Sequence, residues 1–317
     1  MEINDKVKNL LSQLESKYES MGQDMTSYLE GLLYAGSTKY WEYIQTDTLL
    51  SLQKPKTNIP DEMIFIMYHQ ITELYFKLSL HETDQIAENK EITAEWMTAR
   101  LKRINNYFIN LTNSFGIMRE GMEYDQFLKF RMSLLPASGF QSAQYRLIEI
   151  SSTPLVNIVA KDVREQLKST DDSETLVNNL YWKAGATELE TKKKTLTLTE
   201  FEEKYTATFI EYAEKRKHNN IWKKFESIEN KTPELIAEIK RMDLLINVEW
   251  PMVHMRTAGR YLQANGEDTA ATGGTNWRQY LAPRIQKRIF FPELWTANEQ
   301  EQWGSFGVEE LDSIYEI

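Results

Sequence analysis

Apolar residues recur at three- and four-residue steps along most of the chain, and this spacing predicts helices. The clearest case is residues 61–86. Pro60, Asp61 and Glu62 suit the start of a helix, because proline needs no N–H partner there and carboxylates favour the positive end of the helix dipole. The periodic apolar positions form one broad face that we expect to be buried: Ile64, Met67, Tyr68, Ile71, Leu74, Tyr75 and Leu78.

The same spacing predicts further helices. They cover residues 3–20, 93–115, 123–134, 140–150, 154–167, 172–180, 200–216 and 232–260, with a short helix within 40–53. Between them we expect a turn at 54–60, a break at 135–139, a flexible loop at 266–274 and a packed aromatic end at 290–295. Residues 183–199 are polar and include the alternating run TLTLT, which predicts an exposed excursion or a small hairpin.

Strand-like alternation is otherwise scarce, so the predicted fold class is all-α. Neither an internal repeat nor a long linker marks a boundary in the sequence. We therefore predict a single large helical domain over residues 1–317, in which residues 1–36 form an N-terminal helical arm.

Composition narrows the function classes. Of the 317 residues, 41% are hydrophobic and 12% are aromatic, which is enough for a substantial core. The net charge of −10 argues against nucleic acid and against an anionic membrane surface as partners. No apolar run is long enough to predict a membrane span. The absence of cysteine excludes disulfides, thiolate metal ligands and a cysteine nucleophile, and is compatible with a reducing cytoplasm.

Imidazole chemistry has to use one of 4 histidines: His69, His81, His218 and His254. His69 lies on a second stripe of the 61–86 helix, between aromatic residues, where it is either a satisfied core residue or a group pointing into a cavity. His254 lies among apolar neighbours, with Gly259 about one turn later, which indicates close approach by something flat or bulky. A single imidazole on a helix can bind a haem iron, and the alternative is another core histidine.

Three other positions are candidates for binding. Arg131 follows two phenylalanines, and its planar fork suits a carboxylate, although an internal ion pair with Glu149 is the alternative. Ser138-Gly139 leaves room for a small molecule to approach the backbone, because glycine has no side chain. Thr272 precedes paired glycines in a loop that could form a lid.

Several separated stretches together resemble the tryptophan 2,3-dioxygenase family, whose members are all-helical haem enzymes. They are residues 40–55 (YWEYIQTDTLLSLQKP), 61–77 (DEMIFIMYHQITELYFK), 130–146 (FRMSLLPASGFQSAQYR), 250–260, 272–274 and 290–294. The stretches follow the family's order and span roughly residues 30–295. The blocks PASGFQSAQYR and FIMYHQITELYFK are long and specific, so chance similarity is a poor explanation.

The resemblance assigns roles around a haem b cofactor. His254 matches the proximal ligand of the haem iron, and is therefore the expected metal-binding residue. His69 matches the distal histidine that hydrogen-bonds the substrate indole N–H, so it is the expected catalytic residue. Phe65 matches an aromatic residue that lines the indole pocket, and Ser138 and Gly139 match the turn over the distal haem face.

The resemblance also assigns the rest of the substrate site. Arg131 matches the arginine that binds the substrate carboxylate, and Phe127 holds a position that is Phe or Tyr in the family. Thr272 matches the threonine that contacts the substrate ammonium group. Tyr40 and Tyr43 match tyrosines that reach the pocket from a neighbouring subunit. The implied assembly is a cytoplasmic homotetramer, a dimer of dimers, whose N-terminal arms exchange between subunits.

The expected reaction is insertion of O2 across the indole C2–C3 bond of L-tryptophan, giving N-formylkynurenine. The sequence departs from the family's pattern after His254, where the chain is longer and the family's loop becomes ATGGTNW at residues 271–277. Two alternatives stay open, and this departure motivates the first of them. One is a related haem oxygenase for another indole or aromatic amino acid, and the other is a haem-binding protein without turnover.

Overall fold

Helices build the protein throughout the part of the chain that the computed structural model describes, residues 3–134, 141–185, 194–262 and 282–305. Those residues form no strand, and Val159 and Leu180 make an isolated β-bridge, which confirms the predicted all-α class. None of the helices described there has the length and apolar character needed to cross a membrane. The chain forms two compact units, Met1–Gln53 and Lys54–Ile317, each described by itself.

The first unit contains four helices: α1 (Asp5–Ser20), α2 (Met25–Leu33), α3 (Tyr40–Tyr43) and α4 (Thr46–Leu49). The side chain of Asn4 caps α1 by accepting a hydrogen bond from the Val7 N–H, so the helix predicted at 3–20 is confirmed. Residues 40–53 form two short helices rather than one, because Gln45 adopts a left-handed backbone conformation with φ 54°.

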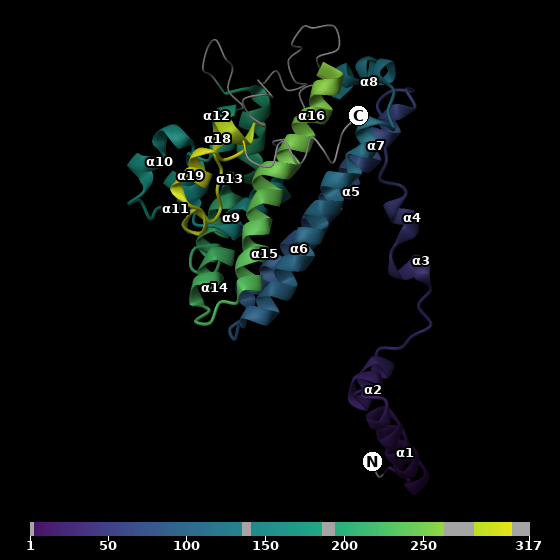
Figure 1. The fold of residues 1–317 in the computed structure, drawn as a ribbon. Coiled ribbons are helices and arrows are strands. Elements are labelled where there is room, and N and C mark those ends of the chain that lie inside the picture. The colour runs from purple at the N-terminus through teal and green to yellow at the C-terminus, as the bar shows by residue number, and fades with distance from the viewer. Residues whose placement is uncertain (1–2, 135–140, 186–193, 263–281, 306–317) are drawn as a thin grey trace. The chain divides into compact units, whose positions relative to one another are not determined.

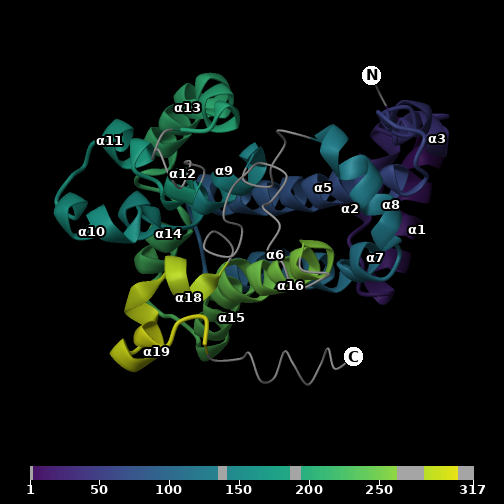
Figure 2. The same ribbon diagram turned by 90° about the horizontal axis from the view of Figure 1, so that it is seen from above.

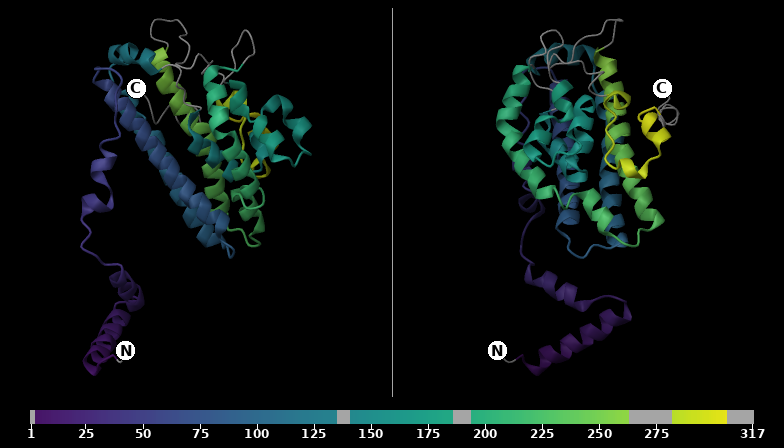
Figure 3. Two further views of the ribbon diagram at one scale, coloured as in Figure 1. Left: turned by 180° about the vertical axis from the view of Figure 1, so that it is seen from behind. Right: turned by 90° about the vertical axis from the view of Figure 1, so that its left-hand side faces the viewer.

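The second unit is organised around long helices (Figure 1): α5 (Asp61–Glu88), α6 (Ala94–Ser114), α15 (Pro233–Leu244) and α16 (Trp250–Leu262). A π-helix, Leu245–Glu249, joins α15 to α16, and Figure 3 shows the two as one continuous rod. Helix α6 packs between α5 and this rod. Its inner positions Leu101, Ile104, Phe108 and Leu111 are fully buried.

Helix α5 forms as predicted, but the prediction of its buried face was wrong at four of the seven positions. Met67, Ile71, Leu74 and Leu78 are 41%, 41%, 48% and 43% exposed. Tyr68 is buried as predicted, but the rest of the buried stripe contains Phe76 together with polar residues such as Ser79 and Thr83. The Ser79 hydroxyl donates to the Tyr75 carbonyl at 3.0 Å and the Thr83 hydroxyl to the Leu80 carbonyl at 2.9 Å. A hydroxyl that donates to a backbone carbonyl of its own helix can be buried at little cost in free energy. The hydropathy of these residues therefore did not reveal this buried face.

The second unit also contains the long helix α13 (Leu196–Arg216) and shorter helices: α7 (Gly116–Arg119), α8 (Tyr124–Arg131), α9 (Ala143–Ser152), α10 (Lys161–Leu167), α11 (Ser173–Asn178), α12 (Tyr181–Gly185), α14 (Ile221–Ser227), α18 (Pro283–Gln286) and α19 (Ala297–Glu301). Single 3-10 turns occur at Met132–Leu134, Leu155–Ile158 and Pro292–Leu294. Figure 2 shows α9 lying between α5 and α13, and both helices contact it.

The run TLTLT forms no hairpin. Thr195 caps α13 by accepting a hydrogen bond from the Leu198 N–H, and the alternating residues make the first turn of that helix. Leu198 is buried while Leu196 is exposed. Much of the predicted excursion, the break at 135–139 and the loop at 266–274 lie outside the described residues.

The aromatic end at residues 290–295 packs as predicted, with Phe290 and Phe291 fully buried. Asp243 of α15 holds this segment. Its carboxylate accepts hydrogen bonds from the backbone N–H groups of Phe290 at 2.9 Å and Phe291 at 3.1 Å, and from the indole N–H of Trp295 at 3.0 Å. Burial raises the pKa of Asp243 to about 6.

Candidate functional site

His254 lies on α16, with its ring held between two aromatic side chains. The ring of Phe115 stacks on it at 5.7 Å and the ring of Trp250, one turn earlier, lies at 5.5 Å. Its Nδ1 atom is buried and has no hydrogen-bond partner among the described residues. Burial, assisted by the charge that His69 would carry, lowers the pKa of His254 to about 4. His254 is therefore a neutral imidazole at pH 7, which is the form that binds a metal.

His69 lies on α5 in a defined tautomer. Its Nδ1 atom is 2.7 Å from the Phe65 carbonyl oxygen. A carbonyl oxygen only accepts hydrogen bonds, so Nδ1 must carry the proton. Burial lowers the pKa of His69, which keeps the imidazole neutral and leaves Nε2 as a hydrogen-bond acceptor. By solvent accessibility, however, the His69 side chain is exposed.

The two histidines lie near each other in the fold. They are far apart in the sequence, yet the charge of His69 contributes to lowering the pKa of His254, so the imidazoles lie within electrostatic range of each other. Aromatic rings bridge them. Tyr68 lies 5.8 Å from His69 and 5.7 Å from Phe115, which in turn stacks on His254. Helices α5 and α16 thus present two neutral imidazoles across an aromatic wall.

Helix α8 supplies the third side of the site. Phe127, Phe130 and Arg131 are all buried. The ring of Phe65 lies 5.7 Å from Phe130 and 6.4 Å from Phe127, which places α8 beside the His69 turn of α5. A buried guanidinium in this aromatic setting suits a carboxylate ligand.

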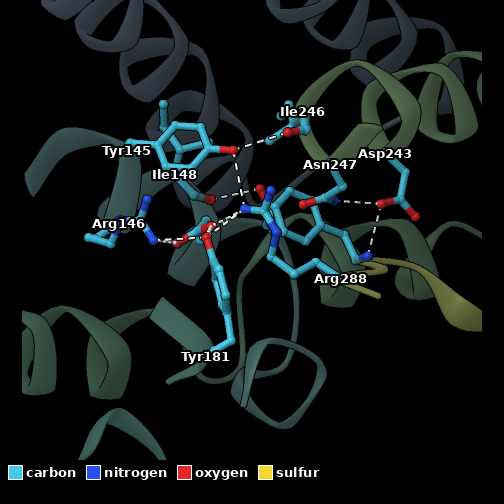
Figure 4. Close-up of polar contacts among 11 residues, drawn as sticks. Tyr145, Arg146, Ile148, Tyr181, Asp243, Ile246, Asn247 and Arg288 are labelled. Atoms are coloured by element: carbon cyan, nitrogen blue, oxygen red, sulfur yellow. Dashed lines mark hydrogen bonds and ion pairs between the residues drawn. The ribbon is translucent and has the colours of Figure 1, made fainter. Parts of the chain in front are cut away.

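The structure does not support the ion pair of Arg131 with Glu149 that the sequence left open, because other side chains bind the Glu149 carboxylate. The Glu149 carboxylate is engaged by Arg146 at 2.9 Å and by Arg288 at 2.7 Å. Tyr181 also donates to it, at 2.6 Å. Figure 4 shows this separate network of buried polar groups around Tyr181 and Arg288.

Comparison with known proteins agrees with this geometry. A family model described as tryptophan 2,3-dioxygenase matches residues 30–248. The chain belongs to the tryptophan 2,3-dioxygenase family. A tryptophan 2,3-dioxygenase of Bacillus thuringiensis subsp. konkukian (strain 97-27) is 32% identical over 273 residues, covering 81% of this chain and 90% of the relative. The tryptophan 2,3-dioxygenase of Bacillus anthracis is 33% identical over 272 residues, with the same coverage of 81% and 90%.

A third relative, the tryptophan 2,3-dioxygenase of Geobacillus thermodenitrificans (strain NG80-2), is 29% identical over 285 residues, covering 86% of this chain and 93% of the relative. The protein is thus an enzyme of the tryptophan 2,3-dioxygenase type. The family-model match ends at residue 248, just before α16. The helix that carries His254 thus lies beyond the residues matched by the family model.

The remaining site residues expected of a tryptophan 2,3-dioxygenase are placed as follows. Tyr40 and Tyr43 lie on α3 in the first unit and are 73% and 80% exposed. Ser138, Gly139 and Thr272 lie outside the described residues. In the described part of the chain no group of three or more His, Asp or Glu side chains could hold a metal ion.

Sequence reasoning missed the two rings that hold His254. Trp250 was recognisable in principle, since it lies one turn before His254 on the same helix. Phe115 was not, because it belongs to the end of α6 and meets α16 only in the folded chain. Both residues fix the imidazole plane and surround it with apolar atoms.

Proposed function

We propose that this protein is a haem-dependent dioxygenase that inserts O2 across the indole C2–C3 bond of L-tryptophan. The C2–C3 bond breaks, each carbon receives one oxygen atom, and the product is N-formylkynurenine. Family membership supports the reaction class. The observation that carries the proposal is the pairing of two neutral imidazoles, His69 and His254, from different helices.

The residues present fit a haem b group. His254 is neutral, partly accessible and flanked by the flat rings of Phe115 and Trp250, and it is the residue that would hold the iron. When bound, the haem supplies the oxygen chemistry, while the protein supplies binding, orientation and electrostatics. By the family resemblance, Ser138 and Gly139 would cover the distal face.

The chain's own residues bind and orient the substrate. Nε2 of His69 accepts the indole N–H, because Nδ1 is committed to the Phe65 carbonyl. His69 acts by positioning, since an indole N–H is too weak an acid to give up its proton readily. Phe65 and Phe127 pack on the indole, and the aromatic surroundings exclude water. Arg131 binds the carboxylate, and Thr272 binds the ammonium group by the family resemblance.

We extend the proposal to a cytoplasmic homotetramer, a dimer of dimers, in which the N-terminal arms exchange and Tyr40 and Tyr43 reach a neighbour's pocket. Exposed apolar side chains on α1 support it. Val7, Leu10 and Leu14 are 42%, 50% and 38% exposed, which is costly for a helix that stays in water. Light scattering of the purified protein tests the assembly, and a monomer would contradict it.

A related reaction on another indole or aromatic amino acid is the second candidate. The observation that favours it is the altered run ATGGTNW at residues 271–277, which contains Thr272, the position expected to bind the substrate ammonium. A panel of amino acids, with mass spectrometry of the products, separates the two candidates. Turnover confined to a substrate other than tryptophan would favour the second.

The direct test uses purified protein loaded with haem. The protein is reduced without air, and then receives L-tryptophan and air while the absorption of formylkynurenine is followed. The proposal predicts that this chromophore grows with time and only when tryptophan is present. Haem-loaded protein that consumes no oxygen on addition of tryptophan would contradict it.

A further inference from the structure

The helix that carries His254 starts at a break in regular hydrogen bonding. In the π-helix Leu245–Glu249, bonds join residues five apart, and the Trp250 N–H accordingly bonds to the Leu245 carbonyl. The next bond in this series would join the N–H of residue 251 to the Ile246 carbonyl. Residue 251 is proline, which has no N–H. The Ile246 carbonyl therefore has no partner in this series, although Ile246 is fully buried.

Tyr145 of α9 takes the place of the missing donor. Its hydroxyl lies 3.0 Å from the Ile246 carbonyl oxygen. A guanidinium N–H of Arg288 lies 3.3 Å from the same hydroxyl. Arginine only donates and a carbonyl only accepts, so the single hydroxyl proton of Tyr145 must point at Ile246. Figure 4 shows this chain from Arg288 through Tyr145 to Ile246.

Packing fixes Tyr145 in this position. Its ring lies 5.1 Å from Trp250 and 5.3 Å from Phe76. Burial raises the pKa of Tyr145, so the phenol keeps its proton and stays a donor. Arg288 is held in turn by Glu149, at 2.7 Å, and by the Tyr181 hydroxyl, at 2.6 Å.

The same contacts lead to His254. Trp250, the first residue of α16, packs on Tyr145 on one side and lies 5.5 Å from the His254 ring on the other. Pro251 lies in the turn that precedes His254. Whatever sets the geometry of this turn also sets the position of the imidazole, because a helix transmits its starting direction rigidly to the next turn.

We propose that Tyr145 is a positioning residue for His254. Its hydroxyl replaces the backbone hydrogen bond that Pro251 cannot make, and so holds the first turn of α16, with Trp250 and His254, in a single geometry. The effect on haem rests on the proposed function, in which His254 is the iron ligand. The hydrogen bond to Ile246 does not depend on that assignment.

The test compares the haem-loaded full-length protein with variants at two positions. Tyr145→Phe leaves the buried Ile246 carbonyl unpaired, and haem should be released about fivefold to tenfold faster, as expected for one unmade buried hydrogen bond. Pro251→Ala restores a backbone N–H that can serve this part of the helix. In the Pro251→Ala background, Tyr145→Phe should therefore change the rate of haem release by less than about twofold.

Tyr181→Phe is the matched control. It removes a hydroxyl from the same network but not from Ile246, so Pro251→Ala should not rescue its effect. If Tyr145→Phe has no effect on haem release, or the same effect in both backgrounds, the proposal is wrong.

Hydrogen exchange of the backbone amides at residues 250–256 supplies a readout independent of haem. Exchange should be faster in Tyr145→Phe than in Tyr181→Phe, and equal exchange would overturn the proposal even if Pro251→Ala fails to fold. Wild-type protein that binds no haem would defeat the proposed function. The exchange comparison would then still decide whether Tyr145 holds the turn.

Discussion

Glu149 is the centre of a buried charge network, and its removal should cost a large part of the protein's stability. The carboxylate is 1% exposed and pairs with Arg146 and Arg288, whose side chains are 3% and 5% exposed. One oxygen accepts from Arg288 at 2.7 Å and from Tyr181 at 2.6 Å, and the other lies 2.9 Å from Arg146. Glu149→Gln keeps the shape of the side chain but removes its charge and turns one acceptor into a donor.

The expected loss in the free energy of unfolding follows from the groups that remain buried after Glu149→Gln. Two buried guanidinium groups keep their charges without a counter-ion, and the new amide N–H₂ group faces a donor in either orientation. Removing one partner of a buried ion pair costs about 3–5 kcal/mol. Aromatic faces soften the loss, because Arg146 lies 4.7 Å from the Tyr145 ring and Arg288 lies 4.6 Å from the Tyr181 ring. We therefore expect the lower end, about 3 kcal/mol.

Urea unfolding followed by circular dichroism measures this difference. Glu226→Gln is the matched control, since Glu226 pairs with Lys223 at 2.7 Å where both side chains are exposed, 46% and 42%. The control should change the free energy of unfolding by less than about 1 kcal/mol. A loss below about 1 kcal/mol for Glu149→Gln would refute the view that this network is desolvated and mutually dependent.

Three further predictions concern the site and Asp243. Arg131→Met should raise the KM for tryptophan about a hundredfold with a smaller effect on kcat, because it removes the proposed carboxylate partner; steady-state kinetics measures this. His69→Ala should retain haem and lower kcat/KM about tenfold without abolishing turnover. His254→Ala should lose haem. Absorption spectra that show haem lost in His69→Ala but retained in His254→Ala would overturn both assignments. The pKa of Asp243 in the folded protein, about 6, exceeds its ordinary value of 3.8, so between these pH values the folded protein binds a proton that the unfolded chain does not. The free energy of unfolding should therefore fall by up to about 3 kcal/mol as the pH rises from about 4 to about 6. Asp243→Asn should remove this slope from urea unfolding measured across that range, and an unchanged slope would assign it to other groups.

The helices could be predicted from sequence because their periodic positions are local. Helix α6 shows this best: Leu101, Ile104, Phe108 and Leu111 recur at helical spacing and are buried. The buried face of α5 was not predictable in the same way. Ser79 and Thr83 are buried, because their hydroxyls form hydrogen bonds within the helix. Leu74 and Leu78 are exposed to solvent. A hydropathy scale predicts the opposite, with the two leucines buried and the serine and threonine exposed.

The site could be predicted only in part. Resemblance to the family selected His69, Arg131 and His254, and in the structure the rings of Tyr68 and Phe115 link the two histidines. The rings that hold them come from other elements, as Phe115 does, and such contacts have no local signal. Pro251 indicated in the sequence that the backbone hydrogen bonding before α16 is incomplete. The hydrogen bond that Tyr145 donates to the Ile246 carbonyl could not be predicted, because it depends on where α9 packs.

The most direct test of the account is an isotope experiment on the haem-loaded, reduced protein. It is given L-tryptophan and ¹⁸O₂, and the product is analysed by mass spectrometry. The account predicts N-formylkynurenine that carries both labelled atoms, and a His254→Ala variant that makes none. A product with one labelled atom or none, or equal turnover by the His254→Ala variant, would contradict it.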